Sequence, residues 1–309
     1  MNFSILNRVV LAAGFVLGSS ALLWSLSSPD YDPEKNDFFT TFHPTGAVVR
    51  NTSGNFVGAG YDWSGMVMFA GTDEAGYWSV GQRGFVSPVH IALAGHTSVI
   101  SGVNPNVVTT MTNERSTFST SSIRTKFPGL GTYLNTGFDL ALGSIGMHVA
   151  PDAGLASYAV PDFADYTGRE IFVTGHGGQN SVNSSRVMIQ QVAGWGGGIN
   201  GYDTSIYTSF SDTAFAQVQS EGGDSGNAIY LGYEDPAGNK QLLLLGVTSG
   251  RNPQSKLNYY SVYGSTAGIN ASNDLMATNG FALKLVGESA TSWTGTDSGD
   301  FGTATNWTA

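Results

Sequence analysis

A serine between glycines is the residue of this sequence best suited to nucleophilic chemistry. Ser225 lies within residues 221–229, which read E-G-G-D-S-G-N-A-I. Glycines on both sides allow a tight turn that exposes the serine Oγ, and backbone N–H groups in such a turn can converge on an oxyanion. The apolar residues that follow predict a strand leading away from the turn. Loops without chemistry have the same composition, so this stretch alone leaves both interpretations open.

Two further residues could complete an acid–base relay with this serine. His96 follows the apolar run 85–93 and a turn of small residues, where a neutral imidazole could act as a general base. Asp139 opens the apolar run 139–142, where a buried carboxylate could orient that imidazole. Taken singly, each has an ordinary alternative: a surface or core histidine, and an aspartate that ends a turn before a strand.

The order of these residues along the chain restricts the class of protein. His96 comes first, Asp139 second and Ser225 last. Subtilisins and α/β-hydrolases carry the same residue types in other orders. The serine motif is also G-D-S-G, whereas α/β-hydrolases have a G-x-S-x-G elbow. Order and motif together favour the chymotrypsin type.

At this point the chain resembles the chymotrypsin/trypsin-like serine proteases, over roughly residues 55–287. The family's motifs I-S-P, A-A-H, D-I-A-L, V-T-G-W-G, G-D-S-G-G and G-I-V-S-W-G have counterparts here in the same order. These counterparts are residues 86–88 (VSP), 94–96 (AGH), 139–142 (DLAL), 173–177 (VTGHG), 223–227 (GDSGN) and 246–251 (GVTSGR). His176 replaces the family's tryptophan, so we expect it to be structural, and we expect the same of His90.

The resemblance implies a fold and a set of roles. The fold would be all-β, with two antiparallel six-stranded β-barrels and the active site in the cleft between them. Ser225 would be the nucleophile of a peptide hydrolase, His96 its base, and Asp139 the residue that fixes the imidazole. The N–H groups of Gly223 and Ser225 would form the oxyanion hole. A polypeptide would be the substrate, with no cofactor and no metal.

The resemblance also places a specificity pocket. Gln219 would form its floor, Ser220 would follow, and residues 248–251 would form the opposite wall. We list these wall residues as Thr248, Ser249, Gly250 and Arg251. No aspartate lies at the floor, which argues against cleavage after Arg or Lys. A polar pocket with Arg251 near its mouth could favour an acidic or polar side chain; the alternative is that Arg251 points to solvent.

Several positions depart from the family pattern. Asn227 replaces the second glycine after the serine, and Thr97 replaces a cysteine. No R-I-V-G-G activation site is present, and Arg50 followed by Asn51 is a poor substitute. We therefore expect that Asp224 lacks the new N-terminus that holds it in activated trypsins and is held by local hydrogen bonds. Whether the oxyanion hole is preformed stays open.

Composition excludes several function classes. The chain has 13 Lys and Arg against 23 Asp and Glu, a net charge of −10, which argues against nucleic-acid binding. It has no cysteine, so disulfides, zinc–thiolate sites and a cysteine nucleophile are excluded. The 42 glycines and short strand-like runs separated by turns predict an all-β protein.

The pattern along the chain predicts its organisation. Residues 1–28 resemble a signal peptide, with residues 29–54 as an extension on the domain surface and 55–287 as the protease domain. Barrel one would span about 55–150 and barrel two about 165–287, joined by a linker at 150–166. Residues 288–309 resemble the start of a repeat or linker in autotransporter-like surface proteins. We expect a monomer that is secreted, periplasmic or at the cell surface, touching membranes only through export or a further C-terminal anchor.

A second function class fits the same fold. A binding or adhesion module could retain the trypsin-like architecture without catalysis, since a fold does not determine function. Asn227 and the lack of an activation site favour this alternative, whereas the presence of all three triad residues argues against it.

Overall fold

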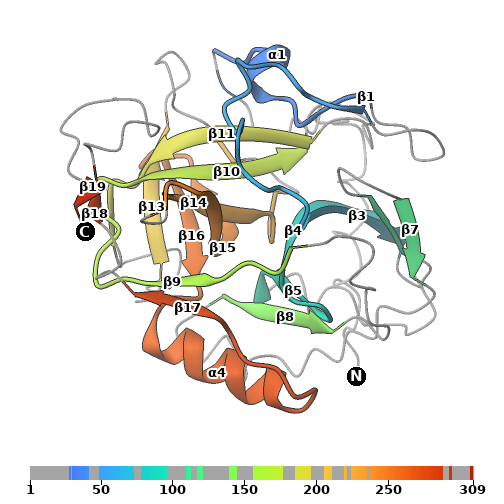
Figure 1. Ribbon diagram of the computed structural model, residues 1–309. Helices are drawn as coiled ribbons and strands as arrows, with labels where there is room; N and C mark the ends of the chain where they lie inside the picture. Colours follow the sequence, from blue (N-terminus) through green and yellow to red (C-terminus); the bar gives the residue numbers. More distant parts are fainter. Residues whose placement is uncertain are drawn as a thin grey trace, which may run out of the picture.

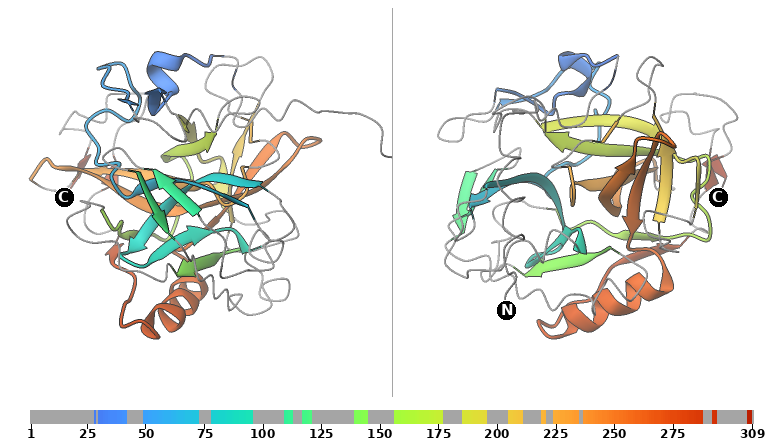
Figure 2. Two further views of the ribbon diagram at one scale, coloured as in Figure 1. Left: turned by 90° about the vertical axis from the view of Figure 1, so that its right-hand side faces the viewer. Right: turned by 180° about the vertical axis from the view of Figure 1, so that it is seen from behind.

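Most strands of the described residues form two antiparallel sheets that lie side by side (Figures 1 and 2). The computed structural model describes residues 28, 30–41, 49–72, 78–95, 109–112, 117–120, 139–144, 156–176, 185–195, 205–210, 219–220, 224–234, 237–287, 292–293 and 307–308.

The first sheet has six strands in the order β7-β6-β3-β4-β5-β8. They are β3 (Met66–Thr72), β4 (Trp78–Ser87), β5 (His90–Leu93), β6 (Thr109–Thr112), β7 (Thr117–Thr120) and β8 (Ala141–Ser144). Every neighbouring pair is antiparallel. The apolar runs of the sequence at 66–70, 84–86 and 139–142 therefore lie in strands, although β8 begins two residues after Asp139, at Ala141.

The second sheet curls until its two ends meet. Its order is β11-β10-β14-β15-β16-β13-β12. The strands are β10 (Glu170–His176), β11 (Ser185–Gln191), β12 (Gly194–Trp195), β13 (Ser205–Ser209), β14 (Ala228–Glu234), β15 (Lys240–Asn252) and β16 (Leu257–Val262). β12 continues β11 after two residues and pairs with β13, so β11 and β12 act as one bent strand of a six-stranded barrel. The predicted all-β fold of two antiparallel β-barrels of the chymotrypsin type is confirmed.

The central strands of the second barrel bury both faces. In β14, Ala228 and Tyr230 face a core shared with the first sheet, whereas Ile229 and Leu231 face the interior of the second barrel. β15 alternates in the same way over residues 242–245. Because successive side chains of a strand point to opposite faces, burial on both sides requires an uninterrupted apolar run. This requirement explains the runs A-I-Y-L and L-L-L-L.

A helix and a parallel strand pair lie beneath the two sheets (Figure 1). β9 (Val160–Asp162), within the predicted linker, pairs in parallel with β17 (Leu285–Gly287). Helix α4 (Thr266–Ala277) begins at Ser265, whose Oγ accepts a hydrogen bond from the N–H of Gly268 at 3.0 Å. The first turns consist of small and polar residues with little apolar period, so the sequence alone indicates a helix only near residues 273–277.

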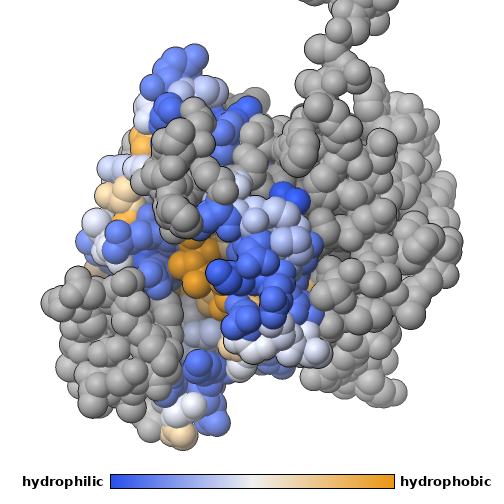
Figure 3. Space-filling view, turned by 90° about the horizontal axis from the view of Figure 1, so that it is seen from above, coloured by the Kyte–Doolittle hydropathy of each residue, from blue (hydrophilic) through white to orange (hydrophobic). Residues whose placement is uncertain are grey.

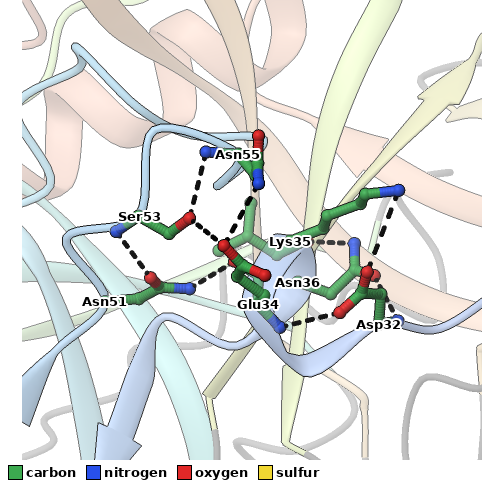
Figure 4. Close-up of polar contacts among 8 residues, drawn as sticks. Asp32, Glu34, Lys35, Asn36, Asn51, Ser53 and Asn55 are labelled. Atoms are coloured by element: carbon green, nitrogen blue, oxygen red, sulfur yellow. Dashed lines mark hydrogen bonds and ion pairs between the residues drawn. The ribbon is translucent and has the colours of Figure 1, made fainter.

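The N-terminal segment is bound to the sheets through both polar and apolar contacts. Its helix α1 (Pro33–Asn36) is linked to residues 51–55, where Glu34 Oε1 accepts hydrogen bonds from Ser53 Oγ at 2.7 Å and Asn55 Nδ2 at 3.1 Å (Figure 4). The short strands β1 (Phe39–Thr41) and β2 (Val49–Arg50) pair with each other. Phe38 is completely buried in the shared core. The predicted surface location is therefore wrong for Phe38, because its ring packs against Phe56 and Trp63.

The two ends of the chain carry the remaining predictions about organisation. The predicted signal peptide, apart from Ser28, lies outside the described residues. The predicted C-terminal repeat or linker contains the strand pair β18 (Ser292–Trp293) and β19 (Trp307–Thr308), and its assignment stays a prediction. None of the described helices is long and apolar enough to cross a membrane.

The described surface is mainly hydrophilic on the face that carries α1, with small hydrophobic areas between (Figure 3). Among the described residues, the exposed large hydrophobic side chains are Trp195 and Leu285. The ring of Trp195 stacks on Tyr166 at a centroid distance of 5.3 Å. Apolar side chains are thus largely confined to the two cores.

His90 is a structural residue in the first sheet, in agreement with the role expected from the sequence. Its ring is buried, with Nδ1 2.7 Å from Ser87 Oγ and Nε2 3.1 Å from Asn279 Nδ2. Since the Asn279 amide donates to Nε2, Nδ1 carries the proton and donates to Ser87. Burial lowers the pKa of His90 to about 4 from its ordinary value of 6.5.

We predict that stability falls as the pH drops from about 6.5 towards 4. In this window His90 is protonated in the unfolded chain but not in the folded protein. The free energy of unfolding therefore decreases by about 2–3 kcal/mol as the pH drops, and then levels off. Urea unfolding of the wild type and His90→Gln across this pH range measures the effect. The variant should lose that part of the pH dependence; identical pH dependence in both proteins would contradict the assignment.

Candidate active site

Ser225 lies in a short turn, residues 224–227, which we call the Ser225 turn. The N–H of Asn227 donates to the carbonyl of Asp224 at 2.9 Å, and Gly226 has a φ of +80°, a conformation that favours glycine. The turn is fastened to β15: Gly226 N–H donates to the carbonyl of Thr248 at 2.8 Å, and Thr248 N–H donates to that of Asn227 at 2.9 Å. Ser225 itself is half-buried and directly precedes the residues that lead into β14.

Asp139 is buried just before β8 and is held by the second barrel. Its exposed fraction is 6%. Ser249 Oγ, in β15, donates to Asp139 Oδ2 at 3.0 Å and lies 2.6 Å from Ser261 Oγ in β16. Since the single proton of Ser249 goes to the carboxylate, Ser261 donates to Ser249. Burial with a directed hydrogen bond fixes the orientation of this carboxylate.

His96 and Gly223 lie outside the described residues, but the strand that leads to His96 is described. β5 pairs with β8 so that Leu93 faces Ala141, and the same register directs Gly95 towards Asp139. Tyr263, from the second barrel, fixes this pairing: its hydroxyl accepts from the N–H of Leu93 at 3.3 Å and donates to the carbonyl of Ala141 at 2.6 Å.

The end of this strand also abuts the Ser225 turn. A Cβ placed on Gly226 would lie 3.1 Å from the backbone N of Ala94. Ala94 is completely buried. The described structure thus brings together Asp139, Ser225 and residues 94–95, which directly precede His96.

The predicted pocket residues that are described lie on β15 and just before the Ser225 turn. Ser220 and Thr248 are buried, whereas Gln219, Gly250 and Arg251 are half-buried. Ser249 has its hydroxyl directed to Asp139, so it supports the carboxylate. The N–H of Ser220 donates to Asn258 Oδ1 at 2.9 Å, which joins the predicted floor to β16.

A network of neutral polar side chains backs Ser220. Asn258 Nδ2 donates to Thr208 Oγ1 at 3.2 Å, and Tyr260 OH donates to Gln190 Oε1 at 2.9 Å. All of these side chains are buried. Neutral groups in the barrel interior satisfy one another without a charge, which keeps the desolvation cost low. Sequence reasoning missed this network because its members come from separate strands.

Arg83 in β4 was also missed from the sequence, because it belongs to no motif and its partners come from another segment. Its side chain is 3% exposed, and its Nη1 donates to Asn227 Oδ1 at 3.2 Å. Burial lowers the pKa of Arg83 to about 10, so the guanidinium stays protonated at neutral pH. Asn227 Nδ2 in turn donates to Asp224 Oδ1 at 2.9 Å. Within the described residues, no group of three or more His, Asp or Glu side chains could hold a metal ion.

Comparisons with known proteins give structural but no sequence matches. No protein-family model matches the chain, and no curated protein matches it. The solved structures similar to it include HL collagenase, at 19% identity and a TM-score of 0.48 over 73% of this chain and 99% of that one. At this TM-score the likeness adds no argument, and the fold assignment rests on the strand order.

Two further solved structures are similar at lower identity. A scabies mite inactivated protease paralogue is 13% identical, with a TM-score of 0.47 over 70% of this chain and 95% of that one. A Glu endopeptidase in complex with MPD is 15% identical, with a TM-score of 0.43 over 68% of this chain and 90% of that one. Neither likeness decides activity or substrate.

We predict that Gly226→Ala destabilises the protein more than Gly168→Ala. Both glycines have a φ of +80°, so in both variants the left-handed backbone lowers the free energy of unfolding by about 1 kcal/mol or more. Only at Gly226 would the added Cβ press on neighbours, namely Ala94 and the guanidinium of Arg83. Nothing lies within 4 Å of a Cβ at Gly168. Urea unfolding measures the difference, and equal losses would show that the approach to Ala94 is not a close one.

Proposed function

We propose that this chain is a serine endopeptidase in which Ser225, His96 and Asp139 form the catalytic triad. The observation that carries the proposal is the meeting of the Ser225 turn with residues 94–95 and Asp139 at one end of the first sheet. Buried Asp139, held by Ser249, suits the residue that orients an imidazole. We further propose that the chain is exported, on the strength of residues 1–28.

The proposed reaction proceeds through an acyl-enzyme. Ser225 Oγ bonds to the scissile carbonyl carbon while its proton passes to His96, and the N–H groups of Gly223 and Ser225 stabilise the oxyanion. The C–N bond then breaks, and His96 gives its proton to the leaving amine. A water then attacks the acyl carbon while its proton passes to His96. The bond between the acyl carbon and Ser225 Oγ breaks, His96 returns the proton to Oγ, and the acid is released. The Asp139 carboxylate stabilises the imidazolium.

We propose that the pocket accepts a polar or acidic side chain. The predicted pocket residues, Gln219 and Ser220 with the wall 248–251, contain no carboxylate, which disfavours Arg and Lys. Half-buried Arg251 lies on β15 after Gly250, in register with Asn258. A peptide library measures the preference, and cleavage mainly after large apolar residues would contradict it.

We predict that a fluorophosphonate probe forms one covalent adduct with the wild type and none with Ser225→Ala. The probe reacts with a serine only when a neighbouring base activates it. Intact mass measures the adduct, and unfolding curves establish that both proteins are folded. Equal labelling of both would exclude Ser225 as the nucleophile. A folded wild type that never reacts would favour the binding-module alternative.

We predict that Ser249→Ala lowers kcat about 10- to 100-fold with little change in KM. The variant removes a hydrogen bond to a buried carboxylate, which contributes about 1.5–3 kcal/mol, and so misorients Asp139. Steady-state kinetics on a chromogenic peptide measure both constants. Ser261→Ala is the matched control, because it leaves the bond from Ser249 to Asp139 in place; a larger loss in this control would contradict the assigned direction of the hydrogen bonds.

A further inference from the structure

The guanidinium of Arg83 occupies a space formed by two glycines. A Cβ on Gly81 would lie 2.5 Å from Arg83 Nη1, and a Cβ on Gly226 would lie 3.3 Å from Arg83 Cζ. A side chain at Gly81 would therefore displace the guanidinium, and one at Gly226 would press on it. Arg83 comes from β4 of the first sheet, so its head reaches across to the Ser225 turn of the second barrel.

The polar contacts of Arg83 connect it to the Ser225 turn. Nη1 donates to Asn227 Oδ1 at 3.2 Å, and Nη2 lies 3.5 Å from the carbonyl O of Ser225. The N–H of Gln82 also donates to Asn227 Oδ1, at 2.9 Å. The first sheet thus fixes the amide oxygen of Asn227 with one charged and one neutral donor.

The other end of the Asn227 amide holds Asp224. Nδ2 donates to Asp224 Oδ1 at 2.9 Å, and both side chains are completely buried. A positive charge at the amide oxygen polarises the amide, which strengthens donation by its N–H groups. Arg83, Asn227 and Asp224 therefore form a chain of hydrogen bonds that brackets Ser225 from both sides.

The N-terminal segment is already bound elsewhere. Asn51 follows Arg50, the poor candidate for an activation site, and is 4% exposed. Its Nδ2 donates to the carbonyl of Glu34 at 2.7 Å (Figure 4). Its Nδ2 also donates to the carbonyl of Asp37 at 2.8 Å, and its backbone N–H donates to that of Phe38 at 2.8 Å. A chain end created at Asn51 would have to break these bonds before it could move to Asp224.

We propose that Arg83 is a positioning residue that holds the Ser225 turn through Asn227, so that the chain reaches its working geometry without cleavage after Arg50. This inference rests on the proposed serine endopeptidase function. Arg83 touches no reacting atom; it acts on the backbone that carries Ser225. The internal arginine thereby holds the turn in place of the new N-terminus that proteases activated by cleavage use.

The test uses the full 309-residue chain and the variants Arg83→Met and Arg186→Met. Arg186 is the matched control, because it is also buried, at 7% exposure, but stacks on Tyr31 and pairs with Asp37 away from the turn. The measurements are the rate of fluorophosphonate labelling, kcat and KM, thermal unfolding, and amide hydrogen exchange of peptides covering residues 224–230 and 186–191.

We expect Arg83→Met to be labelled about 10- to 100-fold more slowly, through kcat with KM nearly unchanged, as the loss of charged hydrogen bonds implies. Exchange of residues 224–230 should become faster in this variant only, and wild type uncleaved after Arg50 should label fully. Full labelling of folded Arg83→Met, an equal loss in Arg186→Met, or labelling only after cleavage would overturn the proposal.

The proposal can still be tested if Arg83→Met does not fold or if the wild type does not label. If Arg83→Met does not fold, Asn227→Ala tests the same chain of bonds, and full labelling of this variant overturns the proposal. If folded wild type does not label at all, the endopeptidase function fails. Hydrogen exchange then still decides the role of Arg83 in the turn: faster exchange of residues 224–230 in Arg83→Met supports it, and unchanged exchange overturns it.

Discussion

The packing of β14 and β15 against the first sheet is the constraint on which the site depends. Both strands bury alternate side chains in two different cores, so a shift of one residue would exchange the two sets and leave neither core filled. The Ser225 turn enters β14 directly, and Ser249 lies within β15. The register that fills the cores therefore also sets the distance between the serine and the carboxylate that Ser249 holds.

The two barrels are joined at the site by buried hydrogen bonds, in a chain that has no cysteine. Tyr263 bonds the ends of β5 and β8, Ser249 bonds Asp139, and Arg83 bonds Asn227. Each bond joins segments far apart in the sequence. The bonds of Tyr263 and Arg83 are buried, and the bond of Ser249 is partly buried. Because a hydrogen bond is stronger away from water, its loss there costs more. These contacts hold the Ser225 turn of one barrel and Asp139 of the other at the same end of the first sheet.

The sequence predicted the parts of this structure that depend on local pattern. Long apolar runs predicted the strands, and the order of His96, Asp139 and Ser225 predicted the fold class. Both signals can be read along the chain without knowing which segments meet in space. Asn227 was noted only as a departure from the family, and Arg83 not at all, since their roles exist only where two sheets meet. Phe38 was misplaced for the same reason: its neighbours in the core come from other segments.

Arg83 poses an energetic question that packing alone does not answer. Removing a guanidinium from water costs several kcal/mol, and a well-packed apolar residue at such a position is often neutral or stabilising. Its hydrogen bonds are accepted by carbonyl oxygens of the Ser225 turn and of its own strand. The stabilisation that offsets this cost is therefore local, because the charge orders the few residues that carry Ser225. Stability and order of the site are separate quantities here, and a more stable protein could hold its serine less well.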